Sequence, residues 1–230
     1  MACIGCLVRV DIKFCGLTRT EDADQAVALG AAYTGVILAG GPRQVTAARA
    51  AEILANVPPS VRRVGVFGDQ ATDEIVRVAE VARLDVVQLH GGHDDRSVAE
   101  LRRSFQGDIW RVVRLGPTPL PRDAHIVGAA GDVGDGLLLD SYVQGALGGT
   151  GVALPWETLA PRVAELRKAC AGRPIILAGG LKSGNVQRAI RALAPDVVDV
   201  SSGVESAPGI KDHSRMRVFR DAVTIAALSA

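Results

Sequence analysis

Side chains that can exchange protons stand at the ends of several short apolar segments of this chain. Cys15 ends one segment, His90 another and Asp140 a third, and Asp199 lies near the end of a fourth. Each segment reads as a β-strand, and the carboxyl ends of parallel strands meet on one side of a barrel or sheet, where active sites form. We therefore expect these four side chains to gather at one site.

Cys15 has two interpretations. A free cysteine is commonly a buried and inert side chain. Side chains alternate between the two faces of a strand, however, so Lys13 and Cys15 share one face while Ile12 and Phe14 take the other. A lysine on the same face and a position at a strand-to-loop junction favour a functional thiol.

Lys13 and Asp199 also have a structural interpretation. Alternation places Asp199 on one face with Ser201, and Gln88 on one face with His90. In a closed barrel the first and last strands are neighbours, so Lys13 and Asp199 would neutralise each other as an interior ion pair. We give this structural role at least as much weight as a catalytic one.

Glycine-bearing loops after the last two predicted strands suggest a phosphate site. The segments "LAGGL" (177–181) and "VSSGVES" (200–206) carry the candidates Gly179, Gly180, Ser201, Ser202 and Gly203. Barrels of parallel strands commonly bind phosphate with these two loops and a helix N-terminus, where free N–H groups point at the anion. Glycine pairs also serve plain turns, but two such loops favour a phosphorylated small molecule as ligand.

The elements that must position these residues alternate along the chain. Strands are predicted over 8–15, 32–38, 63–67, 85–90, 109–115, 135–140, 174–179 and 196–202. Helical patterns between them include 21–30, 71–83 and 163–170, the first with Thr20 as N-cap and Gly30 past its end. The strands are nearly continuous apolar runs, as in parallel sheets covered by helices. We predict an α/β fold, the (β/α)8 or TIM barrel, with a doubly wound open sheet as the alternative.

No linker or low-complexity stretch divides the chain. We expect a single domain over residues 1–230, with 1–7 as a frayed N-terminal extension. Residues 141–156 are rich in glycine and follow Asp140. This segment is either a plain connector or a loop that closes over a substrate and excludes water.

Composition excludes several classes of protein. The 26 basic and 25 acidic residues leave a net charge of +1, which indicates neither a nucleic-acid nor a membrane partner. No apolar run approaches the roughly 18 residues of a membrane helix, and the N-terminus lacks the pattern of a secretory signal. Four cysteines are too few for a disulfide framework, and we interpret Cys3 and Cys6 as unstructured thiols. We expect a reduced, cytoplasmic protein, a monomer or a homodimer.

Several blocks resemble, in the same order, phosphoribosylanthranilate isomerase of tryptophan biosynthesis. They are "KFCGLTRTEDA" near the start, "VGVF" (64–67), "VQLHG" (87–91), "LLLD" (137–140), "GGTG" (148–151), "LAGGL" with "NV" (177–186) and "VDVSSGVESAPGIKD" (198–212). The resemblance implies a (β/α)8 barrel without metal or organic cofactor. It also implies an aldose–ketose isomerisation, the Amadori rearrangement of N-(5-phosphoribosyl)anthranilate to 1-(o-carboxyphenylamino)-1-deoxyribulose 5-phosphate.

The resemblance further implies roles for single residues. The family's general base falls on Cys15 and its general acid on Asp140. Arg43 matches the arginine that holds the anthranilate carboxylate, although this chain has "ILAGGPR" where many members carry an aromatic residue and Lys-Ser before Pro-Arg. The supporting pocket residues are Lys13, His90 and Asp199, and the phosphate falls on Gly179, Gly180, Ser202 and Gly203. A nearby cation lowers the pKa of a thiol, so Lys13 is expected to assist Cys15 in part, with Asp199 opposing it.

Other functions on the same fold stay open. The histidine-pathway isomerase performs the same rearrangement on another aglycone, but it uses two aspartates, and Cys15 argues against it. A bifunctional isomerase is a further alternative. A phosphate-ligand binding protein without catalysis needs neither Cys15 nor Asp140.

Overall fold

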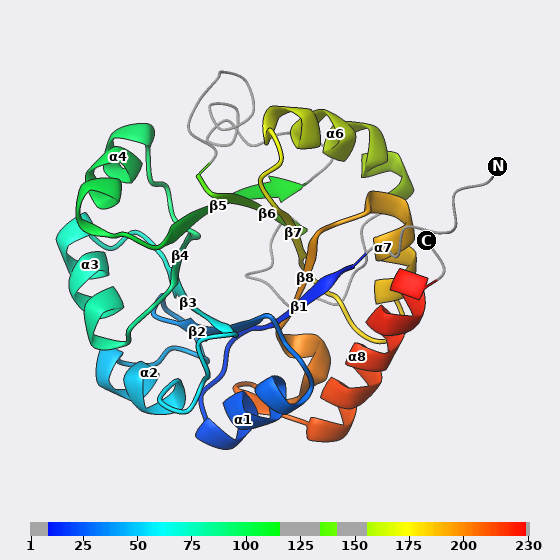
Figure 1. Cartoon of the computed structure of the whole chain (residues 1–230), viewed down its shortest axis with the longest axis horizontal. Coiled ribbons are helices and arrows are strands. Elements are labelled where there is room, and N and C mark those ends of the chain that lie inside the picture. The colour runs from blue at the N-terminus through cyan, green and yellow to red at the C-terminus, as the bar shows by residue number, and fades with distance from the viewer. Residues whose placement is uncertain (1–8, 116–133, 142–155, 229–230) are drawn as a thin grey trace.

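Eight parallel strands form a closed barrel in the computed structural model, which describes residues 9–115, 134–141 and 156–228. The strands are β1 (Asp11–Phe14), β2 (Tyr33–Ile37), β3 (Arg62–Phe67), β4 (Val86–Leu89), β5 (Asp108–Leu115), β6 (Gly136–Ser141), β7 (Ile175–Ala178) and β8 (Val197–Val200). Each strand pairs with the next, and β8 pairs with β1 to close the ring (Figure 1). The prediction of a (β/α)8 barrel is confirmed, and a doubly wound sheet is excluded because it would leave β1 and β8 unpaired with each other.

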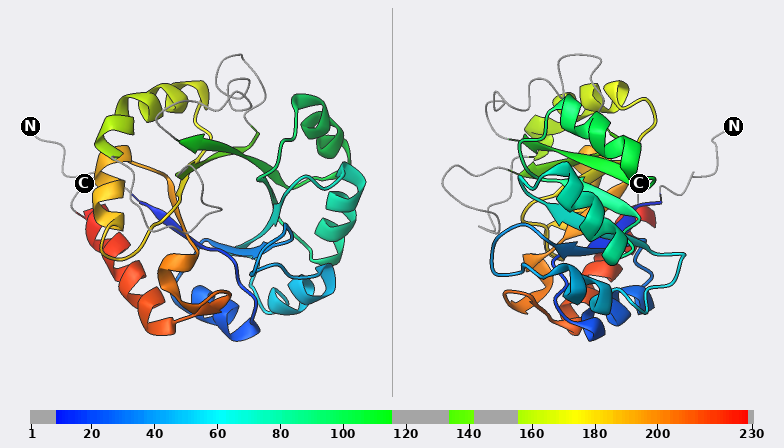
Figure 2. Two further views of the ribbon diagram at one scale, coloured as in Figure 1. Left: turned by 180° about the vertical axis from the view of Figure 1, so that it is seen from behind. Right: turned by 90° about the vertical axis from the view of Figure 1, so that its left-hand side faces the viewer.

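Helices surround this ring of strands. They are α1 (Thr20–Ala28), α2 (Ala47–Ile53), α3 (Thr72–Val81), α4 (Asp95–Ser104), α6 (Trp156–Ala169), α7 (Val186–Leu193) and α8 (His213–Leu228). Views from behind and from the side place them outside the strands (Figure 2). A short helix η2 (Ser202–Val204) and a hairpin of β9 (Glu205–Ala207) and β10 (Ile210–Lys211) connect β8 to α8. The expected extension over 1–7 and residues 142–155 of the glycine-rich loop lie outside the described residues.

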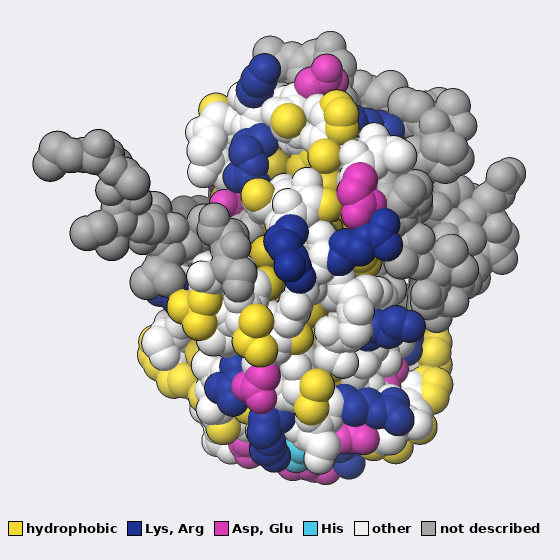
Figure 3. Space-filling view, turned by 90° about the vertical axis from the view of Figure 1, so that its right-hand side faces the viewer, with side chains coloured by type: hydrophobic (Ala, Val, Ile, Leu, Met, Phe, Trp, Pro, Cys, Tyr) yellow, Lys and Arg dark blue, Asp and Glu magenta, His cyan; other side chains and the backbone are white. Residues whose placement is uncertain are grey.

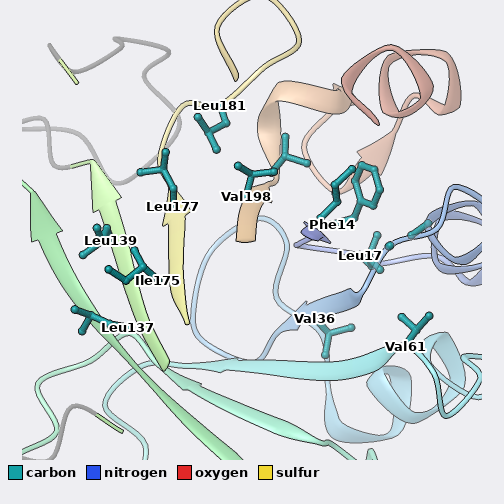
Figure 4. Close-up of a cluster of buried hydrophobic side chains, with 14 of the residues drawn as sticks. Phe14, Leu17, Val36, Val61, Leu137, Leu139, Ile175, Leu177, Leu181 and Val198 are labelled. Carbon is teal, nitrogen blue, oxygen red and sulfur yellow. The ribbon is translucent and has the colours of Figure 1, made fainter. Parts of the chain in front are cut away.

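Alternation along the strands divides the buried apolar side chains into two cores. Leu137 and Leu139 on β6 and Ile175 and Leu177 on β7 belong to the larger, outer core between strands and helices (Figure 4). The inner core consists of Val64, Val86, Trp110, Val112, Leu138, Ile176, Ala178 and Val197. Residues that continue the inner face beyond this apolar plug therefore face the mouth of the barrel at the carboxyl ends of the strands.

The predicted N-cap of α1 is wrong, and the predicted glycine past its C-terminus is confirmed. Thr20 is not the N-cap: α1 begins at Thr20, and Arg19 occupies the cap position without a side-chain cap hydrogen bond. The Arg19 side chain forms an ion pair across the first turn, donating from Nε and Nη2 to the two carboxylate oxygens of Asp22 at 3.0 and 2.6 Å. Gly30 does lie past the C-terminus, with a φ of +75° that favours glycine.

One side of the outer surface shows mixed charge. The side of the molecule with α7 and α8 shows basic side chains scattered among acidic ones and small apolar patches (Figure 3). This distribution matches the net charge of +1. No helix in the described part of the chain is long and apolar enough to cross a membrane.

Candidate active site

The end of β1 places Cys15 in a buried position at the mouth. Cys15 is only 6% exposed to solvent. Gly35 on β2 faces it, since a Cβ at that position would lie 3.2 Å from the Cys15 Sγ and 3.2 Å from the Lys13 Nζ. The thiol and the ammonium group thus share one small space, as the alternation of the strand predicts.

Burial decides the protonation of this thiol. It raises the pKa of Cys15 above its ordinary value, and the positive charge of Lys13 opposes that rise only in part. Asp199 adds to the rise. The expected help from Lys13 is therefore present but smaller than the cost of removing the thiolate from water.

Lys13 and Asp199 form the predicted interior ion pair. Their strand positions are directly paired in the β1–β8 register, and the Lys13 Nζ lies 2.9 Å from the Asp199 Oδ2. The lysine side chain is fully buried. Although burial opposes it, the negative charge of Asp199 helps to raise the pKa of Lys13, so the lysine remains a cation at neutral pH. The other carboxylate oxygen of Asp199, Oδ1, is buried without a hydrogen-bond partner among the described residues.

His90 and Asp140 meet on the opposite part of the rim. The His90 Nε2 lies 3.4 Å from the Asp140 Oδ2, and both side chains are partly exposed. Sequence reasoning missed Arg114, which pairs with Asp140 in the β5–β6 register and donates from Nη2 to the carbonyl of His90 at 3.3 Å. Its signal was available: Trp110 and Val112 line the inner core, so the same alternation turns Arg114 inward at the strand end.

Arg43 extends from the loop after β2 into the mouth beside Cys15. A Cβ added to Gly16 would lie 2.7 Å from the Arg43 Cδ and 2.9 Å from the Ser201 Oγ. The residue after the cysteine must therefore be small, because the arginine stem and the serine both pack on it. Arg43 also forms a two-point ion pair with Glu205, which sequence reasoning had left without a role.

The two predicted phosphate loops lie against each other. Gly179 and Gly180 have φ values of +90° and +62°, which bend the chain sharply after β7. Gly203 in η2 packs so closely on this loop that an added Cβ would lie 1.9 Å from the Leu181 carbonyl oxygen. The Ser201 Oγ is buried without a hydrogen-bond partner among the described residues. Together the loops form a glycine-lined corner with an unused hydroxyl group.

The structure thus brings the predicted residues together at one end of the barrel. Lys13, Cys15 and Asp199 form one group, His90 and Asp140 a second, and the glycine loops a third, with Arg43 between Gly16 and Glu205. Cys3 and Cys6 lie outside the described residues. Within residues 9–115, 134–141 and 156–228, no three His, Cys, Asp or Glu side chains are grouped as metal ligands would be.

This fold and site define a class: (β/α)8-barrel enzymes whose reactive side chains line the carboxyl ends of the strands. A more specific assignment comes from comparison with known families. Residues 12–222 match the family described as N-(5'phosphoribosyl)anthranilate (PRA) isomerase. The chain belongs to this family.

Individual relatives agree with that assignment. The N-(5'-phosphoribosyl)anthranilate isomerase of Chromohalobacter salexigens is 42% identical over 217 residues, which cover 94% of this chain and 95% of the relative. The crystal structure of phosphoribosyl anthranilate isomerase from Thermotoga maritima is 30% identical, with a TM-score of 0.80 over 93% of this chain and 98% of that one. A further structure of such an isomerase holds reduced 1-(o-carboxyphenylamino)-1-deoxyribulose 5-phosphate, at 29% identity and a TM-score of 0.76, covering 93% of this chain and 98% of that one.

Proposed function

We propose that the protein is the isomerase of tryptophan biosynthesis that converts N-(5-phosphoribosyl)anthranilate to 1-(o-carboxyphenylamino)-1-deoxyribulose 5-phosphate, with Cys15 as general base and Asp140 as general acid. The observation that carries the proposal is the presence at one mouth of a buried thiol beside a cation and a carboxyl group beside His90. The histidine-pathway alternative and a bifunctional enzyme are disfavoured by the cysteine and by the family of the chain.

The first step opens the sugar ring. Asp140 donates a proton to the ring oxygen, the bond between that oxygen and C1 breaks, and the nitrogen lone pair forms a C=N bond to C1. His90, at 3.4 Å from the Asp140 carboxylate, is suited to hold this group in position. General acid catalysis of this kind contributes about 10²–10⁴-fold to a rate.

The second step removes the proton from C2. The Cys15 thiolate accepts it, the electron pair of the C–H bond forms a C1=C2 bond, and the C=N electrons return to nitrogen. The resulting enolamine then loses its hydroxyl proton to water and gains a proton at C1 from water, which yields the ketose, and proton exchange with water restores Asp140 and Cys15. Lys13 stabilises the thiolate, although burial outweighs this effect and keeps the pKa of the thiol raised.

Arg43 and the two loops would hold the ends of the substrate. The planar guanidinium group suits the anthranilate carboxylate. The phosphate is assigned to Gly179, Gly180, Ser201, Ser202 and Gly203, since a hydroxyl and a tight glycine turn are grouped there. We further expect the protein to act in the cytoplasm, as one domain and as a monomer or a homodimer.

The assay for this function is the loss of anthranilate-type fluorescence when purified protein meets freshly made substrate. The wild-type protein should remove the signal, and Asp140→Asn should lower kcat by about 10²–10⁴-fold while binding is largely kept, because an amide cannot deliver the proton. A wild-type protein without turnover would contradict the proposal. An Asp140→Asn variant with most of its kcat would move the acid to another residue.

The phosphate assignment needs a variant that does not disturb packing. Gly203→Asp is unsuitable, because its Cβ would collide with the Leu181 carbonyl oxygen. Ser202→Asp adds a negative charge at the same corner and should raise KM strongly by repelling the phosphate dianion. Ser206→Asp adds the same charge on the exposed part of β9 and serves as the control. Equal KM values for the two variants would move the phosphate elsewhere.

A further inference from the structure

Glu205 makes an unusually complete contact with Arg43. The Arg43 Nε donates to Oε1 at 2.8 Å and Nη2 donates to Oε2 at 2.7 Å. This is a side-on, two-point ion pair, in which one edge of the guanidinium is occupied by one carboxylate. In the described part of the chain, no hydrogen bond is formed by Nη1, so the edge formed by Nη1 and the second N–H of Nη2 faces away from Glu205.

The Glu205 carboxylate is itself bound by a second cation, Lys211. The Lys211 Nζ donates to the Glu205 Oε1 at 2.8 Å and to the carbonyl oxygen of Ser201 at 3.1 Å. The Glu205 side chain is 5% exposed and that of Lys211 is fully buried. A buried carboxylate with donors on both oxygens has little freedom to rotate. Its orientation is therefore transmitted to Arg43.

The hairpin that carries these two residues also forms hydrogen bonds with the loop after β1 and with α1. The Thr18 hydroxyl donates to the carbonyl of Gly209 at 2.5 Å, and Lys211 donates from its backbone N–H to Asp22 at 3.2 Å. The β9–β10 hairpin thus lies fixed against the loop that follows Cys15. It reaches from the Ser201 corner to the Arg43 side chain.

We infer that Glu205 is a positioning residue that sets the aglycone specificity of the enzyme, by holding Arg43 side-on so that its remaining edge receives the carboxylate of the substrate. The inference rests on the proposed role of Arg43. Arginine has a rigid fork, so occupation of one edge fixes the direction of the other. A ligand carboxylate then binds without first ordering the arginine, whose partly exposed side chain would otherwise lose conformational freedom on binding.

Two other roles for Glu205 make different predictions. If it competed with the substrate for Arg43, removing its charge would strengthen binding of the carboxylate-bearing substrate. If it only supported the fold, its loss would weaken turnover of every substrate alike. The test therefore compares the normal substrate with the same phosphoribosylamine built on aniline, which lacks the carboxylate.

Glu205→Gln keeps the shape of the side chain but supplies an amide group where a second acceptor is needed. We expect kcat/KM for the normal substrate to fall about 10- to 100-fold, mainly through KM, since a charge-assisted contact to the substrate is weakened. The aniline substrate should change less than about threefold. Glu52→Gln makes the same exchange in the exposed Arg49–Glu52 pair and should leave kcat/KM unchanged for both substrates.

Further variants keep the inference testable if Glu205→Gln folds poorly. Glu205→Asp retains the charge at a shorter reach and should give a smaller loss with the same preference for the normal substrate. In an Arg43→Ala background, Glu205→Gln should no longer change the ratio of the kcat/KM values for the two substrates, because Glu205 acts through the arginine. Equal losses on both substrates, or a lower KM for the normal one, would overturn the inference. Equal losses for Arg43→Ala alone would contradict the proposed role of Arg43 instead.

Discussion

Two groups of buried charges lie near the mouth of the barrel, and their hydrogen bonds are satisfied differently. Inside the barrel, Lys13 and Asp199 form a single contact of 2.9 Å, and the Asp199 Oδ1 has no hydrogen-bond partner among the described residues. Beyond the strand ends, Glu205 uses both oxygens: Oε1 accepts from the Arg43 Nε and from Lys211, and Oε2 accepts from the Arg43 Nη2.

The difference indicates two uses of buried charge. A buried ion pair seldom stabilises a fold more than apolar side chains of similar volume would, because both charges lose their water. The interior pair is better explained by its neighbour Cys15, whose pKa responds to both charges. The rim cluster of Arg43, Glu205 and Lys211 is better explained by geometry. Glu205, itself held by Lys211, fixes the direction of the Arg43 guanidinium group. The pair of Lys13 and Asp199 changes the pKa of Cys15, whereas Glu205 and Lys211 orient the guanidinium group of Arg43.

The largest expected effect is at the residue between these groups. Cys15→Ser should lower kcat by about 10²–10⁴-fold or more, because a hydroxyl group is a far poorer base at neutral pH. The near-isosteric exchange should change stability by less than about 1.5 kcal/mol. Steady-state kinetics and a urea unfolding curve measure both. A Cys15→Ser variant with near-normal kcat would reduce the interior pair to a structural feature.

Breaking the interior pair should be the next largest effect. Lys13→Met leaves a buried carboxylate without its cation, and we expect the free energy of unfolding to fall by about 3–5 kcal/mol. The double variant Lys13→Met/Asp199→Leu should recover much of this loss, because no charge is left unpaired. Arg96→Met, in the exposed Arg96–Glu100 pair, is the control and should change little. A Lys13→Met variant of normal stability would show that the two carboxylate oxygens find water instead.

Removing the donor of the rim cluster should have a smaller and more selective effect. Arg43→Ala should lower kcat/KM for the normal substrate by about 10- to 100-fold, the range expected for a lost hydrogen-bonded charge pair. The aniline substrate should lose much less. This variant also leaves Glu205 with Lys211 alone, so unfolding by urea should be measured beside the kinetics. Matching losses on both substrates would assign Arg43 to the loop rather than to the ligand.

The smallest expected effect is a shift in the pH dependence of the Cys15 thiol, which reports the interior pair of Lys13 and Asp199 directly. Only the thiolate reacts with iodoacetamide, and burial raises the pKa of Cys15, so the rate of Cys15 alkylation, followed by mass spectrometry, should rise roughly tenfold per pH unit from about pH 7 to pH 9. Lys13 lowers this pKa more than Asp199 raises it. The double variant Lys13→Met/Asp199→Leu should therefore shift the rise to still higher pH. A plateau already present at pH 7 would mean that the thiol is ionised there.

Much of the site follows from local patterns. The strict alternation of a strand placed Lys13 and Cys15 on one face, and closure of the barrel made Lys13 and Asp199 neighbours. The same alternation places Arg114 beside Asp140, although its residue type alone assigns it no role. Thr20 shows the limit of local signals: its side chain suits an N-cap, but the Arg19–Asp22 ion pair spans the first turn instead.

The sequence by itself determined the barrel, the inward faces of its strands and the group of residues at their ends, because each depends on a period of two or on the order of elements along the chain. Only the tertiary structure decided that burial outweighs Lys13 at the Cys15 thiol, and that Glu205 joins Arg43 to Lys211. Desolvation depends on every segment packed around a group. A contact between residues 43 and 205 depends on a fold that brings together positions 162 residues apart.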